Sequence, residues 1–394
     1  MIDASRRGAR RLKLGILSGE LFDPEVTGIG GFGWAAKQVS RCFSSDPALG
    51  VDPVLVMAWT VPPAQSAGHS TMHGAPVIWR APRAIDHVRR LRAERFDLLL
   101  AIDNLAAYRL CTWALPRTPV IYWMRDPWTP AIHATLATLR IPGDDTRPRG
   151  IAPRSLPSFR WDFRLSRGIG RRMLFASPAR LVAARMQDSL GFTPRMAHLP
   201  NIIDVPDGPE GIPRTPRPSV VFVGRLDPVK RPWVAAAVAS RMPEVDFHFL
   251  GRSHFSGPGS WQPGELPANL QLHGHVDGER KTNLIAGAWA LLNTSIHEGL
   301  PVTFQEALAC ATPLVSCVDP DGVVSRFGVH LGEAPGDGMD LVPRAVDALR
   351  GLLSDAPLRE RLGRDGRDWV TATHSRERFL AAFRDLCRDA GVLP

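Results

Sequence analysis

The sequence has 394 residues, of which 44% are hydrophobic, and this is enough to fill the cores of two α/β domains. Its net charge is +9, no apolar run is long enough for a transmembrane helix, and no signal-type cleavage site follows the basic N-terminus, so we expect a cytoplasmic protein. Five scattered cysteines without CxxC spacing argue against a disulfide framework and a zinc site, and are expected to be buried thiols.

The charge is unevenly distributed. Residues 1–205 hold 28 Lys and Arg against 16 Asp and Glu, a net charge of +12, whereas residues 206–394 have a net charge of −3. A basic first half can attract phosphate-bearing lipid, an anionic membrane or nucleic acid, and it can equally be a solvated arginine-rich surface. Peripheral attachment to the inner face of a membrane therefore stays open. Nucleic acid is not expected as a partner, because no recognised motif accompanies the charge.

Short apolar, β-branched runs alternate with helical stretches along the whole chain, which indicates parallel βα units. A segment dense in Pro and Gly, residues 207–218, interrupts this rhythm, which then restarts. The first series of expected strands is 12–18, 51–59, 96–103, 119–124 and 172–177. The second series is 219–226, 246–251, 270–276, 290–295 and 313–318.

The rhythm predicts an N-terminal Rossmann-like domain over residues 1–205, a linker over 206–218 and a C-terminal Rossmann-like domain over 219–374. Two doubly wound domains in tandem are expected to face each other across a cleft at the carboxyl ends of their strands. A last helix is expected over about 375–390, with one buried stripe of apolar residues. Packing of this helix back onto the first domain is an arrangement that the pattern leaves open. The stripe consists of Phe379, Ala382, Phe383 and Leu386.

Between Ile141 and Arg172 the rhythm breaks into a segment rich in Arg and Pro, in which aromatic residues are interleaved. Three interpretations remain: a lid, a patch for lipid headgroups or for an acceptor, and a mobile loop without a specific role.

The segment 293–316, "NTSIHEGLPVTFQEALACATPLVS", is the richest in chemistry. A strand is expected to end near Ser295, Gly299 permits a tight turn, and Pro301 suits the first position of a helix. The free amides and the dipole at the start of that helix favour a phosphate or the hydroxyl groups of a sugar. Glu298 on the loop and Glu306 in the helix add carboxylates, which accept hydrogen bonds from vicinal hydroxyls.

Two cations are expected at the same edge of the sheet. Arg225 ends a strand, and Lys230, one of only four lysines beside 44 arginines, begins the next helix. Two cations that face a helix N-terminus form a cradle for a diphosphate. Together these residues predict a nucleotide-sugar site.

These motifs resemble the glycosyltransferase family 4 group of retaining GT-B enzymes. The matching residues are "GRLDPVK" (224–230) and the Glu-x7-Glu pattern "EGLPVTFQE" (298–306), and "TGIGGFGWAAKQVS" and "LPNIID" add to the likeness. The resemblance implies a GT-B fold, no cofactor and a metal-independent enzyme of the EC 2.4 class with a nucleotide diphosphate-sugar as donor.

The resemblance also implies roles for individual residues. Arg225 and Lys230, with Gly30 and Gly31 of the first domain, would bind the donor diphosphate, and Glu306 would bind the ribose hydroxyls. The transferred sugar would lie against Glu298 and the backbone of Gly299, Leu300 and Pro301. The backbone of His275 and Val276 would contact the base.

One departure concerns the acceptor side. The family commonly has a His-Asp pair at the end of a first-domain strand, whereas this chain has Arg125 before Asp126. An arginine stays protonated and is no general base, but it can stabilise the departing diphosphate or hold an anionic acceptor. Asp126 is then the candidate base, or a partner of Arg125. Asp319 and Asp321 have DxD spacing in a turn-like context, and we interpret them as a turn without metal.

The sequence thus predicts a retaining hexosyltransferase that uses a UDP- or GDP-type sugar. Its acceptor, whether a glycan, a lipid-linked or a small molecule, is not specified by the motifs. The excess of Arg over Lys suggests a GC-rich bacterial source. Two alternatives remain: a sugar-nucleotide epimerase of the same fold, and a non-catalytic protein that binds a nucleotide-sugar.

Overall fold

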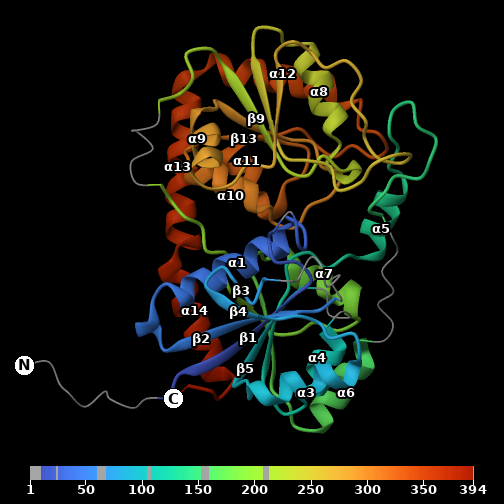
Figure 1. The fold of residues 1–394 in the computed structure, drawn as a ribbon. Coiled ribbons are helices and arrows are strands. Elements are labelled where there is room, and N and C mark those ends of the chain that lie inside the picture. The colour runs from blue at the N-terminus through green and yellow to red at the C-terminus, as the bar shows by residue number, and fades with distance from the viewer. Residues whose placement is uncertain are drawn as a thin grey trace, which may run out of the picture. The chain divides into compact units, whose positions relative to one another are not determined.

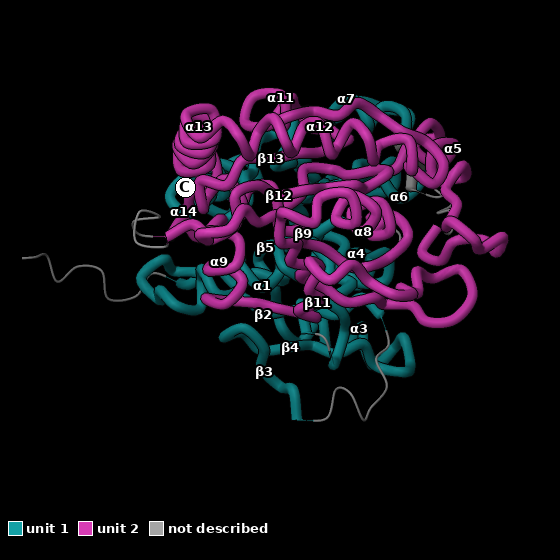
Figure 2. The backbone as a smooth tube through the Cα atoms, turned by 90° about the horizontal axis from the view of Figure 1, so that it is seen from above, with its two compact units in different colours: residues 1–127, 155–202, 376–394 teal, residues 128–154, 203–375 magenta. Residues whose placement is uncertain are grey.

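The computed structural model describes residues 10–23, 25–59, 68–103, 108–151, 159–206 and 213–393. The chain divides into two compact units, each built on a parallel sheet with helices beside it (Figure 1). Unit 1 comprises residues 1–127, 155–202 and 376–394, and unit 2 comprises residues 128–154 and 203–375 (Figure 2).

Unit 1 contains an eight-stranded sheet in the order β3-β4-β2-β1-β5-β6-β7-β8. All neighbouring strands are parallel except β3 and β4, which form an antiparallel pair. The strands are β1 (Leu12–Ser18), β2 (Val51–Met57), β3 (Thr71–Met72), β4 (Ala75–Ile78), β5 (Leu98–Ile102), β6 (Val120–Trp123), β7 (Met173–Ser177) and β8 (Met196–His198). The helices are α1 (Gly31–Ser44), α3 (Ala84–Glu94), α4 (Arg109–Ala114), α6 (Phe159–Gly168), α7 (Leu181–Leu190) and α14 (Arg376–Asp389).

Successive residues of β6 show how the two faces of this sheet are covered. Side chains alternate across a strand, so Tyr122 and Trp123 point to opposite faces. The ring of Tyr122 lies 6.1 Å from that of Phe163 in α6, and the ring of Trp123 lies 5.9 Å from that of Phe379 in α14. The sheet of unit 1 is therefore enclosed by α6 on one face and α14 on the other.

The last helix belongs to unit 1 and completes its core. Phe379, Phe383 and Leu386 of α14 are buried, as the apolar stripe in the sequence predicts. The ring of Phe383 lies 5.1 Å from that of Phe43 in α1. Helices α1 and α14 thus pack together on the same face of the sheet.

Unit 2 contains a six-stranded sheet in the order β11-β10-β9-β12-β13-β14, and all of its pairs are parallel. The strands are β9 (Ser219–Val223), β10 (Asp246–Leu250), β11 (Leu270–Gly274), β12 (Ala290–Asn293), β13 (Leu314–Ser316) and β14 (Gly328–His330). The helices are α5 (Pro130–Ala137), α8 (Pro232–Ser240), α9 (Gly278–Gly287), α10 (Val302–Ala309), α11 (Val323–Phe327), α12 (Leu341–Ser354) and α13 (Ala356–His374).

Residues 128–154 follow β6 in the chain but belong to unit 2, which differs from the expectation that 1–205 form one domain. The reason is the burial of apolar side chains, because Leu136, Leu139 and Ile141 lie in the same hydrophobic cluster as the β-strand residues of unit 2. A polar contact also holds this segment, because the Gly259 N–H donates to Asp144 Oδ2 at 2.9 Å. The Arg-rich segment 141–172 is consequently shared between the units, with α6 in unit 1.

Two further expectations concern individual features. All five cysteines are buried and none forms a disulfide, as predicted. Within the described ranges, no helix combines the length and the apolar character needed to cross a bilayer. Residues 207–212, which belong to the expected linker before β9, lie outside the described residues.

Candidate nucleotide-sugar site

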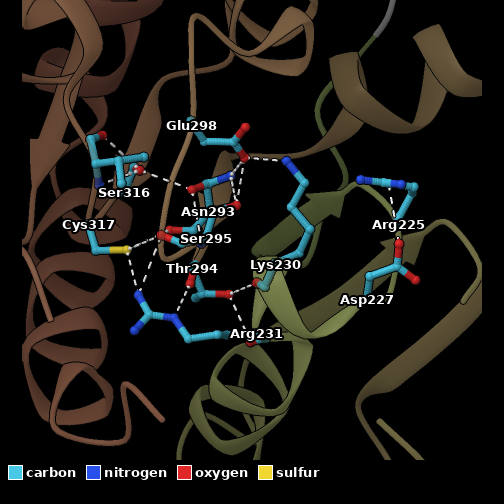
Figure 3. A network of polar contacts seen from close by, with 11 residues as sticks. Arg225, Asp227, Lys230, Arg231, Asn293, Thr294, Ser295, Glu298, Ser316 and Cys317 are labelled. Atoms are coloured by element: carbon cyan, nitrogen blue, oxygen red, sulfur yellow. Dashed lines mark hydrogen bonds and ion pairs between the residues drawn. The ribbon is translucent and has the colours of Figure 1, made fainter. Parts of the chain in front are cut away.

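The fold of unit 2 brings together the two segments that carry its chemistry. Strands β9 and β12 are parallel neighbours, with Val221 opposite Leu291, so the loops after their carboxyl ends are adjacent. The loop after β9 leads through a short 3₁₀ turn, Pro228–Lys230, and the loop after β12 leads to α10. Figure 3 shows the polar network that joins the two loops.

Glu298 lies at the centre of this network. Its Oε1 atom accepts hydrogen bonds from the ammonium group of Lys230, from Ser295 Oγ at 2.6 Å and from Asn293 Nδ2 at 3.3 Å (Figure 3). The side chain of Glu298 is 10% exposed and that of Lys230 is 21% exposed. A partly desolvated ion pair of this kind has a stronger interaction than a surface pair, because less water screens it.

A second group of polar residues holds Glu298 in place through hydrogen bonds. Asn293, Ser295 and Ser316 are buried at the ends of β12 and β13. Ser316 Oγ donates to Asn293 Oδ1 at 3.2 Å, and the Ser295 N–H donates to the same oxygen at 3.2 Å. Asn293 thereby presents its amide nitrogen to Glu298. Sequence reasoning missed these three residues, although polar side chains directly after apolar strands are a signal for a site.

Arg231 is the unexpected residue of the site. It looks like the second member of a basic pair, yet it is 0% exposed and adopts a left-handed backbone conformation with φ of 48°. Its guanidinium donates to the carbonyl oxygens of Thr294 and Ala334 at 2.7 and 2.6 Å, and to Cys317 Sγ at 3.3 Å. Burial lowers the pKa of Arg231, and the neighbouring Cys317 opposes that effect. This side chain fixes the loop that leads to Glu298.

The side chain of Arg225, at the end of β9, is partly exposed to solvent. Its Nε atom lies 3.3 Å from Oδ2 of the buried Asp227, while the side chain remains 37% exposed. The carboxylate of Asp227 also accepts from the His254 N–H at 2.9 Å. Asp227 therefore orients a guanidinium that still faces solvent, as a group that binds an anion requires.

Glu306 pairs with a lysine that the motifs did not single out. Nζ of Lys281 in α9 lies 2.6 Å from Glu306 Oε1 in α10, and 3.9 Å from Asp277. Burial lowers the pKa of Lys281, but attraction to Glu306 and the hydrogen bond to it outweigh burial, so the pKa is raised above its ordinary value. Lys281 therefore stays charged, and its ammonium group holds the side chain of Glu306 in place. The rarity of lysine in this chain is the signal that could have identified it.

The remaining expected residues of unit 2 lie in its loops. Leu300 is buried, and Pro301, with φ of −61°, is the residue before the first turn of α10, so that helix begins at Val302, one residue later than expected. Gly299 lies in the same loop. His275 and Val276 lie between the end of β11 and the beginning of α9, the helix that carries Lys281.

In unit 1, the glycine-rich loop precedes α1, with Gly30 as the residue before the helix and Gly31 as its first residue. The amide hydrogens of Gly30 and Gly33 both point at a carboxylate: they donate to Glu20 at 2.9 and 3.3 Å. A Cβ atom at Gly30 would lie 2.1 Å from Glu20 Oε1, so this contact requires glycine. Glu20, which sequence reasoning missed, thus occupies an amide pair suited to an anion.

Arg125 and Asp126 also lie in unit 1, directly after β6. Arg125 is 6% exposed, donates to Asn201 Oδ1 at 2.7 Å and lies over the ring of Trp123. Burial lowers its pKa to about 10, although Asp103 opposes the shift, so this arginine remains charged at neutral pH. Asp126 forms an ion pair with Arg185 at 2.8 Å.

The DxD residues have a local role. Oδ1 of Asp319 accepts hydrogen bonds from the N–H groups of Val324 and Ser325, at 2.7 and 3.3 Å, near the start of α11. Asp321 lies in the short turn before that helix, with φ of 54°. Within the described ranges, no group of three or more His, Cys, Asp or Glu side chains is arranged to hold a metal ion.

Comparisons with known proteins show a likeness in part of the sequence and in the fold. Residues 210–369 match the family of glycosyl transferases group 1, and this stretch contains Arg225, Lys230, Glu298 and Glu306. No curated protein matches the sequence significantly.

Several solved structures are similar over the whole chain. Sucrose-phosphate synthase from Thermosynechococcus elongatus has a TM-score of 0.70 at 13% identity, with 96% of this chain and 98% of that chain covered. Anabaena Alr3699/HepE, solved in complex with UDP-glucose, has a TM-score of 0.66 at 14% identity, covering 96% and 100%. The glycosyltransferase WaaG, involved in lipopolysaccharide biosynthesis, has a TM-score of 0.59 at 12% identity, covering 96% and 100%. At such identities the likeness establishes the fold, and the predicted GT-B class with two Rossmann-like domains is confirmed.

Proposed function

We propose that this protein is a retaining glycosyltransferase of the family 4 type, which transfers a hexose from a nucleotide diphosphate-sugar to an acceptor without a metal ion. The observation that supports it most directly is the contact of Lys230 with Glu298 beside the start of α10. A cation, a carboxylate and free helix amides at one place suit a ligand with a diphosphate and a hydroxylated sugar. The match of residues 210–369 to glycosyl transferases group 1 supports the same conclusion.

In this proposal each charged side chain binds one part of the donor. Arg225 and Lys230 bind the diphosphate, together with the amides of Gly30 and Gly31. Glu306, paired with Lys281, accepts hydrogen bonds from the ribose hydroxyls. Glu298 and the backbone of residues 299–301 hold the sugar, and the backbone of His275 and Val276 contacts the base. The complex of Alr3699/HepE with UDP-glucose makes a UDP-sugar the first donor to examine.

The chemistry that follows is mainly electrostatic. Negative charge develops on the departing diphosphate, and Arg225, Lys230 and the first turn of α10 stabilise it. The acceptor hydroxyl attacks from the face that the diphosphate leaves, so the anomeric configuration is retained. Arg125 is charged and cannot remove the proton of that hydroxyl, which leaves Asp126 as the candidate base.

The proposal is tested by calorimetric titration of the purified protein with UDP, GDP, ADP and dTDP and with their sugars. We expect one nucleotide to bind, and Lys230→Met and Glu306→Gln each to weaken that binding at least tenfold. Lys13→Met is the matched control, because Lys13 pairs with Glu94 at the edge of β1 in unit 1. Equal affinity in all four proteins would contradict the proposed site.

Product analysis separates the three candidate functions. When the donor that binds is incubated with an acceptor mixture, a transferase forms a glycoside with the configuration of the donor, as NMR of the anomeric proton shows. An epimerase yields an epimeric sugar nucleotide without an acceptor, and a binding protein yields no product.

A further inference from the structure

The outward face of α6 carries an unusual row of apolar side chains. Trp161 is 66% exposed, Leu165 is 54% exposed and Ile169, directly after the helix, is 48% exposed. The Ile169 N–H donates to the Leu165 carbonyl at 3.1 Å, so the helical geometry continues to that residue. Residues four apart lie on the same side of a helix, and these three form one row, which we name the α6 stripe. The helix is labelled in Figure 1.

The opposite face of α6 is firmly anchored, so the stripe is held outward. Asp162 is buried and forms an ion pair with Arg109 of α4 at 2.8 Å, and it accepts a hydrogen bond from Trp113 Nε1 at 2.9 Å. The ring of Phe163 stacks 4.9 Å from that of Phe175 in β7. Ser166 is 3% exposed. A rotation of the helix that hid the stripe would break all of these contacts.

Arginines border the stripe on one side. Arg164 lies over the ring of Trp161, with its guanidinium carbon 5.7 Å from the centre of the ring. Arg164, Arg167 and Arg195 also line a hollow of about 770 Å³ in unit 1, whose other charged residues are Arg171 and Asp389. Among the residues that the structure describes, no carboxylate forms an ion pair with these three arginines. Their positive charge is therefore available to an outside partner.

We propose that the α6 stripe and its bordering arginines dock unit 1 on an anionic lipid bilayer. Trp, Leu and Ile side chains enter the boundary between headgroups and acyl chains, where the amphipathic ring of Trp is favoured. The arginines contact lipid phosphates, whose charge is complementary to theirs. A peptide or protein partner that met a surface of this kind would need a matching row of acids, whereas an anionic bilayer supplies negative charge everywhere. The inference does not depend on the reaction proposed for unit 2.

The test is flotation of the full-length protein with vesicles of phosphatidylcholine alone or with 30% phosphatidylglycerol. We expect at least tenfold stronger binding to the anionic vesicles, and a marked loss of binding in 0.5 M NaCl. The variant Trp161→Ser/Leu165→Ser should lose binding at least tenfold, and Arg164→Gln/Arg167→Gln should lose the preference for anionic lipid. The matched control is Ile85→Ser/Leu272→Ser, which removes two other exposed apolar side chains, of 55% and 43% exposure, and should bind like the parent protein.

A labelling experiment keeps the inference testable if the double variants fold poorly. All five native cysteines are buried, so Leu165→Cys and Ile85→Cys each provide one accessible thiol for an environment-sensitive dye. Anionic vesicles should raise the fluorescence at position 165 and leave position 85 unchanged. The inference is overturned by no binding to anionic vesicles, by equal binding of the stripe variant, or by equal dye responses at the two positions. A dimer in solution that the stripe variant converts to a monomer would assign the stripe to a second copy of the chain instead.

Discussion

Nζ of Lys281 and Oε1 of Glu306 lie 2.6 Å apart, and this contact joins α9 to α10 through side chains that are only 12% and 16% exposed. Removal of one member leaves an ion with little solvation, so we expect Lys281→Met to lower the free energy of unfolding by about 2 to 4 kcal/mol. Nucleotide affinity should fall with it, because Glu306 loses the ammonium group that holds its carboxylate in place. Urea unfolding and calorimetry measure the two effects, and the double variant Lys281→Met/Glu306→Gln should recover part of the stability. Simple additivity of the two losses would contradict the coupling.

A second prediction concerns Arg231, which holds the loop that carries Glu298, and its contribution to the free energy of unfolding. Its guanidinium is buried and donates to three carbonyl oxygens and to Cys317. Arg231→Met would leave these acceptors unsatisfied, and we expect a loss of roughly 3 kcal/mol or more in unfolding free energy. Arg231→Gly should lose more, because the cavity left by this 0% exposed side chain outweighs the about 1 kcal/mol by which glycine relieves the left-handed backbone conformation. Thermal unfolding of both variants tests the order, and greater stability of the Gly variant would refute it.

Glu20 is expected to oppose the binding of a diphosphate. Its carboxylate accepts hydrogen bonds from the Gly30 and Gly33 amides, and the proposed function assigns the Gly30 amide to the donor. Glu20→Gln removes the negative charge while it keeps the size of the side chain. We expect nucleotide affinity to rise about fivefold, from about 1 kcal/mol of lost repulsion, and helix stability to fall by about 0.5 kcal/mol. Weaker nucleotide binding in calorimetry would instead mean that Glu20 positions the loop.

We expect the protein to lose stability in acid because of the buried His87. The side chain is 0% exposed, and burial, with smaller effects from Arg80 and Arg90, lowers its pKa to about 4. An unfolded chain takes up this proton near pH 6.5. Stability due to neutral His87 is therefore complete above pH 6.5 and declines as the pH falls towards 4, by about 2 kcal/mol at pH 5.

The measurement is urea unfolding between pH 7.5 and 5, compared for the parent protein, His87→Gln and His330→Gln. His330 is exposed in β14 and serves as the control. His87→Gln should flatten the dependence on pH by the stated amount, and His330→Gln should leave it unchanged. Identical slopes in all three proteins would show that His87 does not carry the effect.

Most of the strands were predictable because they form short apolar runs within a parallel sheet, and the central ones are buried on both faces. Strands β3, β4, β8 and β14 were not predicted, because they are only two to four residues long and more exposed. The expected strand 12–18 coincides with β1, and the expected strand 246–251 ends one residue after β10. Helix α6 escaped prediction for a physical reason. Its buried positions include the polar residues Asp162 and Ser166, while Trp161 and Leu165 face outward, which is the reverse of the usual apolar pattern.

Other features depend on tertiary contacts that residue types do not encode. Nothing in the sequence of residues 128–154 states which of two apolar cores receives Leu136 and Leu139. In the site, the spacing of Arg225, Lys230, Glu298 and Glu306 was recognisable as a motif, and the structure brings Lys230 into contact with Glu298. The full burial of Arg231 could not be predicted from the sequence, because its partners are mostly backbone carbonyl groups, which every residue type carries.

The return of the chain to unit 1 sets the order in which the molecule can be completed during synthesis. The buried rings of Phe379 and Phe383 in α14 contact Trp123 and Phe43, which a ribosome makes more than two hundred residues earlier. Until α14 emerges, those early aromatic side chains lack their partners and are available to chaperones. The unit that is translated first is therefore finished last, and a nascent chain that ends before Arg376 leaves its N-terminal half unprotected.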